Sequence, residues 1–147
     1  MADPRPAAAL FLEAIPQVMC QLRNHLSESN SGLTVAQFRC LKMVQRNTDV
    51  SLGDLADANG VSAPAMSKLV DGLVEAGFLE RRASTDDRRR IELTVTAAGK
   101  RKLDTVGELL KGRLAAQLST LAADELAALE RALLRLNKVL AEPEVVA

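Results

Sequence analysis

Apolar side chains recur every three or four positions in the first stretch of the chain, which is the spacing of an amphipathic helix. This pattern predicts a helix over residues 10–26. Pro16 lies inside it, and because proline cannot donate a helical hydrogen bond, we expect the helix either to kink or to begin there. Residues 27–32 are rich in Ser, Asn and Gly, which predicts a loop.

Two capping patterns follow the loop. Thr34 and Gln37 have the spacing of a capping box, in which each side chain binds a free backbone N–H of the first turn. They predict a second helix over residues 35–46. Ser51 and Asp54 have the same spacing and predict a short third helix.

The third helix is expected to end at residues 59–60, an Asn-Gly pair. Asn-Gly favours a tight turn, but the flanking patterns are helical, so a helix–turn–helix fits better than a hairpin. Ser62 is the expected N-cap of the fourth helix, Pro64 is tolerated in its first turn, and Gly77 is a typical stop. The apolar stripe of this helix consists of Met66, Leu69, Val70, Leu73 and Val74.

After Gly77 the apolar period changes to about two, which is typical of strands. Residues 78–82 and 91–95 predict an antiparallel hairpin, with 83–90 as a long polar tip and Ile91, Leu93 and Val95 on one face. Thr96 then caps a long helix, and a last helix follows. Their apolar positions are Leu103, Val106, Leu110 and Leu114, and then Leu126, Leu129, Leu133, Leu136 and Leu140.

This order of elements predicts a mainly α fold with a small antiparallel β-hairpin. The order is that of a winged helix-turn-helix, here spanning residues 34–96 of a single chain, 1–147. Helices in 7–28 and 97–142 flank it. Their apolar faces lie outside so small a unit, and leaving them in water would expose a large patch. We therefore expect them to pair in a symmetric homodimer.

Composition narrows the class of protein. The chain has three Phe, no Trp and no Tyr, so its core must be aliphatic. We find no membrane-length apolar run and no secretory signal at the N-terminus, and two cysteines cannot form a disulfide framework. We therefore expect a cytoplasmic protein. The 19 basic and 19 acidic residues cancel, which alone argues weakly against a nucleic-acid partner.

The sequence offers little for catalysis or cofactor binding. His25 is the single histidine, and we expect it at the surface or at an interface. There is no Cys-x-x-Cys pair and no Gly-rich phosphate loop. Asp86 and Asp87 are flanked by arginines, which suits a salt bridge better than a metal. We therefore expect no enzyme activity, no cofactor and no metal site.

Residues 87–99 read Asp-Arg-Arg-Arg-Ile-Glu-Leu-Thr-Val-Thr-Ala-Ala-Gly. This segment resembles the wing signature of the MarR family of regulators, which is D-R-R, two spaced aliphatic residues and T-x-x-G. Residues 61–81 are similar to the family's recognition helix and its exit into the wing. The resemblance extends over about residues 10–141. It implies an obligate homodimer that binds a pseudo-palindromic operator in double-stranded DNA, most commonly as a repressor.

In the recognition helix, five residues of the first two turns lie away from the apolar stripe. Ser62 and Ser67 can donate to phosphates or base edges, Lys68 can bind a phosphate or guanine, and Ala63 and Pro64 can touch thymine methyl groups. An alternative is that Ser62 is only a cap and Lys68 only a solvated residue. The adjoining wing favours the DNA-binding interpretation.

In the wing, Arg88, Arg89 and Arg90 follow Asp87 and are expected to contact DNA. The resemblance implies that Asp87 holds the tip through an ion pair and that Arg89 enters the minor groove. Arginine is favoured in narrow A·T-rich grooves, which supports the assignment of the groove contact to Arg89 and of the ion pair to Asp87. The alternative is that a run of charges is simply solvated.

Arg81 and Arg82, at the wing base, are expected phosphate contacts. Residues 81–90 hold five arginines against two aspartates, so the rest of the chain carries 14 basic and 17 acidic residues. The zero net charge is therefore an average over a basic wing and a mildly acidic remainder. We expect modest non-specific affinity, with DNA contact confined to wings and recognition helices.

Members of the MarR family are often released from DNA by small aromatic or phenolic anions. Arg23, and Arg39 with Met43, could line such a pocket here, although Arg39 could equally pair with a carboxylate. Cys20 and Cys40 raise the alternative of a thiol-based oxidant sensor. A sensor thiol needs a lowered pKa. Peroxide-sensing relatives place tyrosine hydroxyls near the cysteine and this chain has no Tyr, so we expect both to be unreactive and half-buried.

A third hypothesis is a winged helix that binds protein rather than DNA. Such a module would have no use for an arginine-rich wing beside a small, polar-faced recognition helix. The DNA-binding interpretation is therefore preferred.

Overall fold

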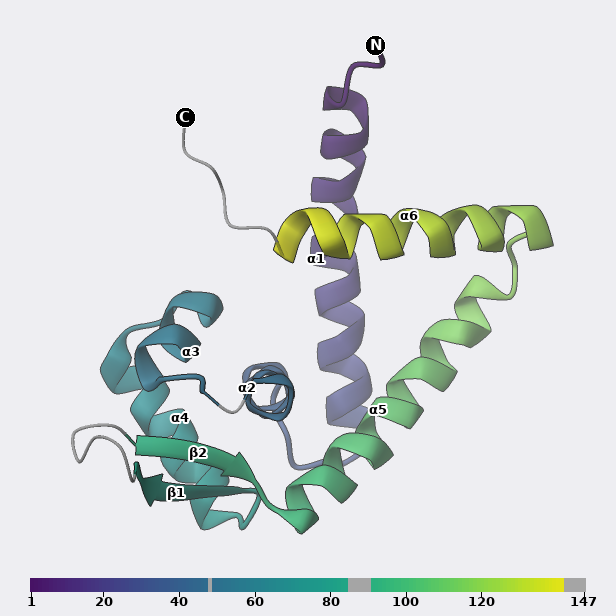
Figure 1. The fold of residues 1–147 in the computed structure, drawn as a ribbon. Helices are drawn as coiled ribbons and strands as arrows, with labels where there is room; N and C mark the ends of the chain where they lie inside the picture. Colours follow the sequence, from purple (N-terminus) through teal and green to yellow (C-terminus); the bar gives the residue numbers. More distant parts are fainter. Residues whose placement is uncertain (48, 85–90, 142–147) are drawn as a thin grey trace. The chain divides into compact units, whose positions relative to one another are not determined.

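The computed structural model describes residues 1–47, 49–84 and 91–141 (Figure 1). It divides into two compact units, Met1–Leu110 and Lys111–Ala147, which we describe separately. None of the helices in the described ranges is both long enough and apolar enough to cross a membrane.

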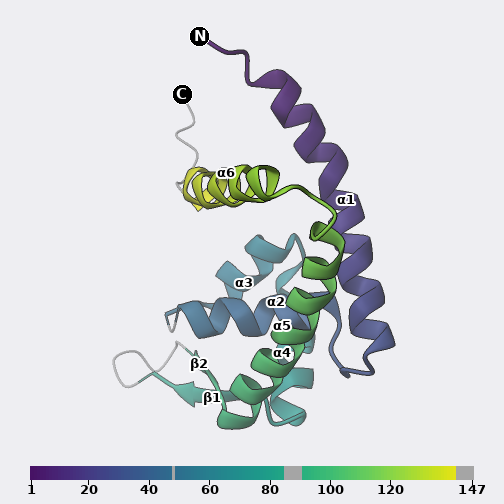
Figure 2. The same cartoon turned by 90° about the vertical axis from the view of Figure 1, so that its right-hand side faces the viewer.

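The first helix, α1 (Arg5–Glu28), begins five residues earlier than the sequence pattern predicted (Figure 2). Proline is tolerated in the first turn, where its missing N–H would have no partner, so Pro4 at the N-cap and Pro6 do not prevent the helix from starting. The helix continues through Pro16, and the alternative that it begins there was wrong.

The three following helices match their predictions and form the helix–turn–helix. They are α2 (Val35–Arg46), α3 (Leu52–Asn59) and α4 (Ala63–Glu75). Both capping boxes are present: the backbone N–H of Gln37 donates to the Thr34 hydroxyl at 3.2 Å, and the N–H of Asp54 donates to the Ser51 hydroxyl at 3.0 Å. These reciprocal bonds satisfy donors that the first turns would otherwise leave free.

Helix α4 ends in a tight turn that leads directly into the hairpin. Gly77 has φ of 82°, a left-handed conformation that residues with a Cβ rarely adopt. The backbone N–H of Gly77 and that of Phe78 donate to the carbonyl oxygens of Val74 and Leu73, respectively. The predicted stop at Gly77 is confirmed.

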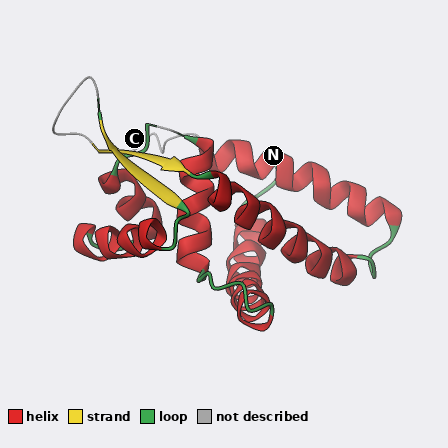
Figure 3. Ribbon diagram, turned by 90° about the horizontal axis from the view of Figure 1, so that it is seen from below, coloured by secondary structure: helices red, strands yellow, loops and turns green. Residues whose placement is uncertain are grey.

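The hairpin consists of β1 (Leu79–Ala83) and β2 (Ile91–Val95), paired antiparallel with Leu79 opposite Val95 and Ala83 opposite Ile91 (Figure 3). Its first strand begins one residue later than predicted. Leu93 and Val95 are buried, but Ile91, on the same face, is 48% exposed. Ile91 is paired with the last residue of β1, at the distal end of the hairpin, where its side chain is not buried.

The core of the first unit is aliphatic, as the composition predicted. Helix α2, seen end-on in Figure 1, contacts α1, α3, α4 and β2. The first part of α5 (Ala97–Leu118) adds three buried apolar side chains, those of Leu103, Val106 and Leu110. The most deeply buried large side chains are Leu41, Leu55, Met66, Leu73, Leu79 and Leu93.

The second unit contains the end of α5 and all of α6 (Ala123–Ala141). None of residues 123–141 is buried in the single chain. The exposed large apolar residues of α6 are Leu133, Leu134, Val139 and Leu140, and those of α1 in the first unit are Leu10, Leu12, Ile15 and Val18.

Candidate nucleic-acid interface

The N-terminal end of α4 presents small and basic side chains to solvent. Ser62, Ala63, Pro64 and Lys68 are exposed and Ser67 is half-buried. The opposite face of the helix is buried in the core through Met66, Val70 and Leu73. The sequence therefore placed the outward face of this helix correctly.

Ser62 is engaged as a cap: its hydroxyl oxygen accepts a hydrogen bond from the backbone N–H of Ala65 at 3.3 Å. The hydroxyl proton is not used by this bond, so Ser62 can cap the helix and still donate to a phosphate or a base edge. The helix N-terminus carries partial positive charge, which favours a phosphate here. No acidic residue lies in this first turn.

The strand β1 separates its two arginines onto opposite faces. Leu79 is buried, and Arg81 lies on the same face because side chains alternate along a strand. Arg82 lies on the outer face with 69% of its side chain exposed, and its Nη2 donates to Glu80 Oε2 at 3.2 Å. Arg82 is thus available to a ligand, since an exposed ion pair of this kind is weak.

Arg81 has a partner that the sequence did not reveal. Its Nη2 lies 2.6 Å from Oδ1 of Asp71, in the third turn of α4. Both Nε and Nη2 of Arg81 are shielded from solvent. The side chain therefore joins the wing to the recognition helix. Strand alternation after Leu79 could have indicated that Arg81 points inward, although not which residue it meets.

The wing tip lies outside the described residues. Asp87, Arg88, Arg89 and Arg90, which the sequence predicted as the tip anchor and the DNA contacts, all belong to that segment. The structure describes the two strands that carry them.

The base of the wing is fastened to the start of α5 by Thr96. Its hydroxyl donates to the carbonyl oxygen of Gly77 at 2.6 Å and accepts from the backbone N–H of Gly99 at 3.0 Å. Its own N–H donates to the carbonyl oxygen of Phe78 at 3.0 Å. The predicted cap is confirmed, and the cap also closes the turn at the end of α4.

Gly99 completes this junction. A Cβ at this position would overlap the carbonyl oxygen of Phe78 and the side chain of Val95. The T-x-x-G spacing of the sequence is thus explained by geometry, because Thr96 joins the two segments and only glycine permits their close approach.

The residues suggested for a small-molecule pocket do not all meet. Arg23 lines a pocket of about 580 Å³ at the end of α1, together with Leu33, Thr34 and Val35. Arg39 and Met43 lie outside that lining. Instead, Arg39 Nη2 donates to the carbonyl oxygen of Ala58 at 3.4 Å, and the Met43 sulfur accepts from Asn59 Nδ2 at 3.9 Å.

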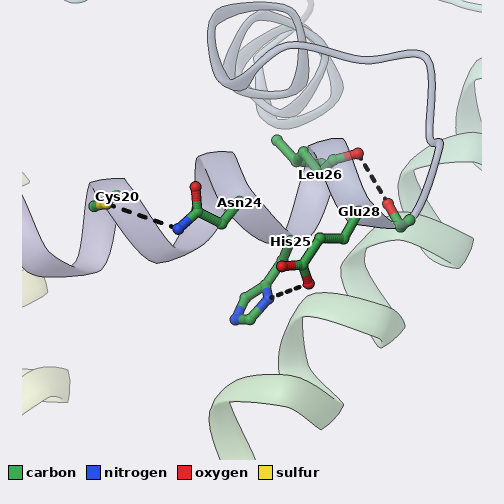
Figure 4. Close-up of polar contacts among 6 residues, drawn as sticks. Cys20, Asn24, His25, Leu26 and Glu28 are labelled. Carbon is green, nitrogen blue, oxygen red and sulfur yellow. Dashed lines mark hydrogen bonds and ion pairs between the residues drawn. The ribbon is translucent and has the colours of Figure 1, made fainter.

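The cysteines differ from the expectation that both are half-buried. Cys20 is exposed, with its sulfur 3.9 Å from Asn24 Nδ2 (Figure 4). Cys40 is fully buried, and desolvation raises the pKa of its thiol from 9.0 to about 11. At neutral pH this thiol is therefore protonated, and because it is the thiolate that reacts with oxidants, Cys40 is unreactive.

His25 was expected at a surface or an interface, and its side chain is 17% exposed in the single chain. Its Nδ1 lies 4.0 Å from Oε2 of Glu28, one turn further along α1 (Figure 4). Within the described ranges, no group of three or more His, Cys, Asp or Glu side chains is placed to hold a metal ion.

The comparisons with known proteins agree with this geometry. The sequence model of the MarR family matches residues 31–90. The HTH-type transcriptional repressor Rv2887 of Mycobacterium tuberculosis is 30% identical over 124 residues, which cover 81% of this chain and 86% of that protein. The curated relatives that match are named as transcriptional regulators or repressors.

Two solved structures are similar over most of the chain. One is the M. tuberculosis MarR family protein Rv2887 in complex with p-aminosalicylic acid, with a TM-score of 0.73, 26% identity, and coverage of 88% of this chain and 97% of that one. The other is a MarR variant from E. coli complexed with operator DNA, with a TM-score of 0.65, 26% identity, and coverage of 89% and 93%. The chain therefore belongs to the MarR family of winged helix-turn-helix transcriptional regulators, and it is not an enzyme.

Proposed function

We propose that this regulator is a homodimeric repressor that binds a pseudo-palindromic operator and is released by a small aromatic acid. The observation that carries the DNA-binding part is the first two turns of α4. Their outward face is free of acidic residues and carries small polar and basic side chains, directly before a hairpin whose tip sequence is arginine-rich. A helix with this outward face fits the major groove, and a hairpin beside it reaches the backbone or the minor groove.

The recognition helix supplies the direct contacts. Lys68 binds a phosphate or a guanine edge, while Ser62 and Ser67 donate to phosphates or bases. Ala63 and Pro64 are small and exposed, which suits contact with thymine methyl groups. None of these side chains belongs to the core, so apart from Ser62, which also caps α4, their replacement should change DNA affinity with little effect on the fold.

The wing supplies contacts along the adjacent minor groove. Arg82 is exposed on the outer face of β1 and is well placed for a phosphate. Arg88, Arg89 and Arg90 are proposed to contact DNA from the tip, with Arg89 in the minor groove and Asp87 holding the tip through an ion pair. Arginine in a narrow minor groove reads the shape of the DNA more than its base sequence.

Exposed apolar faces support the homodimer. The large apolar residues of α1 and α6 that remain exposed in the single chain would cost several kcal/mol to hydrate, at roughly 25 cal/mol per Å² of apolar area. Pairing of the terminal helices around a two-fold axis buries both faces. The two recognition helices would then read two half-sites related by the same axis, about 34–36 Å apart.

A salt titration of operator affinity tests the DNA-binding function. An operator is first selected from a random duplex library, and its dissociation constant is then measured by fluorescence anisotropy between 50 and 300 mM KCl. We expect log affinity to fall linearly with log salt, with a slope of about 0.9 for each phosphate contact. A protein-interaction module would show no selected sequence and no such slope, and this result would refute the proposal.

The Arg23 pocket supports the proposed effector. It joins one guanidinium to apolar Leu33 and Val35, which is the chemistry that binds an aromatic carboxylate. A relative has been solved in complex with p-aminosalicylic acid. We expect millimolar salicylate or p-aminosalicylate to weaken operator binding, and Arg23→Gln to abolish that response. Arg39→Gln is the matched control, because Arg39 lies outside the pocket. An unchanged affinity at millimolar ligand would exclude these acids as effectors.

A further inference from the structure

The ion pair between Arg81 and Asp71 joins the wing to the recognition helix. The distance from Arg81 Nη2 to Asp71 Oδ1 is 2.6 Å, and the two side chains are 31% and 57% exposed. Arg81 lies on the inner face of β1, two residues after the buried Leu79. Its guanidinium is therefore directed toward α4, whereas Arg82 lies on the outer face of the hairpin.

We propose that this ion pair sets the orientation of the wing relative to α4, so that Asp71 and Arg81 are positioning residues for operator binding. This inference rests on the proposed DNA-binding function. It gives Arg81 a role different from the phosphate contact that its sequence position suggested.

The described part of the wing is a two-stranded hairpin. An isolated two-stranded hairpin is marginally stable and needs packing to hold one orientation. The bonds of Thr96 fix the hairpin at its base. Leu93, which pairs with Arg81 across the hairpin, and Val95 pack its inner face into the core, but apolar packing is non-directional. The Arg81–Asp71 contact, two residues along β1 from Leu79, adds a directed contact to α4 that fixes the angle between the strand and the helix.

The negative charge of Asp71 makes the direction of the change in operator affinity informative when this residue is replaced. An acidic residue on a DNA-binding helix repels the phosphates, so its removal should strengthen binding by simple electrostatics. If Asp71 instead orients the wing through Arg81, its removal weakens binding. A loss of affinity in Asp71→Asn therefore cannot come from the change in net charge.

The slope of log operator affinity against log salt concentration shows whether Arg81 contacts a phosphate or only positions the wing. A residue that neutralises one phosphate in each protomer contributes about two to the slope of the dimer. A residue whose charge is already compensated by Asp71, and whose Nε and Nη2 are shielded, contributes none. Arg82, which is exposed on the same strand, provides the contrasting case.

The experiment measures operator affinity against KCl for the full chain and for Asp71→Asn, Arg81→Gln and the double variant. We expect each single variant to weaken binding on the order of tenfold per dimer, the double variant to lose no more than either single one, and the salt slope to stay unchanged. Arg82→Gln should lower the slope. Glu75→Gln, which removes the same charge one turn further along α4, should not weaken binding.

Three results would overturn the inference: unchanged or tighter binding by Asp71→Asn, additive losses in the double variant, or a slope lowered by Arg81→Gln. Thermal unfolding of each variant shows whether the dimer still folds. Should Asp71→Asn not fold, Arg81→Lys serves instead, since it keeps the charge but loses the planar fork, and it should weaken binding without changing the slope. Absence of salt-dependent operator binding in the unmodified chain would instead refute the proposed function itself.

Discussion

The hydroxyl of Thr96 donates a 2.6 Å hydrogen bond to the carbonyl oxygen of Gly77. These residues lie 19 positions apart, on either side of the hairpin, so this bond, together with the one from the Thr96 N–H to the Phe78 carbonyl oxygen, closes the base of the wing. The same hydroxyl accepts from the N–H of Gly99 and caps α5. One side chain thus connects the end of the recognition helix to the start of the helix that leads out of the DNA-binding unit.

Thr96→Val should destabilise the fold. The isosteric valine cannot donate to Gly77 or accept from Gly99, and we expect the free energy of unfolding to fall by about 1–3 kcal/mol. Urea denaturation followed by circular dichroism measures this change. Thr94→Val is the matched control, because Thr94 is exposed on β2, the strand that precedes Thr96, and β-branched residues suit strands. Equal losses in both variants would contradict the junction role of Thr96.

Gly99→Ala should be destabilising although alanine is the better helix former. Its Cβ would overlap the Phe78 carbonyl oxygen, which belongs to the backbone and cannot move aside easily. We expect a loss of roughly 1–3 kcal/mol in the free energy of unfolding. Gly107→Ala, on the same helix with open space at the Cβ position, should instead stabilise by up to about 1 kcal/mol. A stable Gly99→Ala would show that the close contact is not required.

Arg89→Ala should greatly weaken operator binding, because the proposed minor-groove contact is lost in both protomers. Anisotropy titrations measure the affinity, and size-exclusion chromatography with light scattering checks that the dimer is intact. Arg101→Ala is a suitable control, since Arg101 is exposed on α5, outside the wing. Unchanged affinity would count strongly against the proposed wing contact.

The buried thiol of Cys40 should make stability depend on alkaline pH. Because its pKa is 9.0 when exposed and about 11 in the folded chain, the unfolded state loses the proton first. The contribution is therefore complete below pH 9 and disappears as pH rises from 9 to 11, by roughly 2–3 kcal/mol. Urea denaturation at several pH values measures it. In Cys40→Ala this part of the decrease should be absent, and an identical decrease would contradict the assignment.

The two cysteines should differ sharply toward a thiol reagent. Cys20 is exposed and should react with 5,5′-dithiobis(2-nitrobenzoic acid) in the native chain, whereas Cys40 should react only after unfolding. We expect Cys20→Ser to abolish native labelling and peroxide to leave operator affinity unchanged. Peroxide-dependent release that disappears in Cys20→Ser would instead support the oxidant-sensing alternative.

Local sequence rules predicted the helix boundaries where a cap or a turn residue determines them. The capping boxes at Thr34 and Ser51, the cap at Ser62 and the stop at Gly77 depend on residues within a few positions, and all are confirmed. The start of α1 was missed because the apolar spacing begins only at residue 10, whereas the first turn of the helix tolerates the prolines that precede it.

Contacts between distant segments could not be predicted in the same way. The sequence indicated that Arg81 lies near the wing base, but its pairing with Asp71 depends on how β1 packs against α4. Arg23 and Arg39 were grouped by their chemistry, although the fold places only Arg23 in the pocket. Cys40 is fully buried because α2 is surrounded by four other elements, which widens the buried arc beyond a single stripe.

The lack of any buried side chain in residues 123–141 has a consequence for synthesis. Helix α6 is made after the recognition helix and the wing, which precede it in the chain. We expect the DNA-binding unit to acquire its core while the chain is still emerging from the ribosome, and α6 to gain its packing only when a second chain arrives. The cellular concentration of the regulator would then govern its own maturation, and promoters would respond to how much of it is made as well as to any effector.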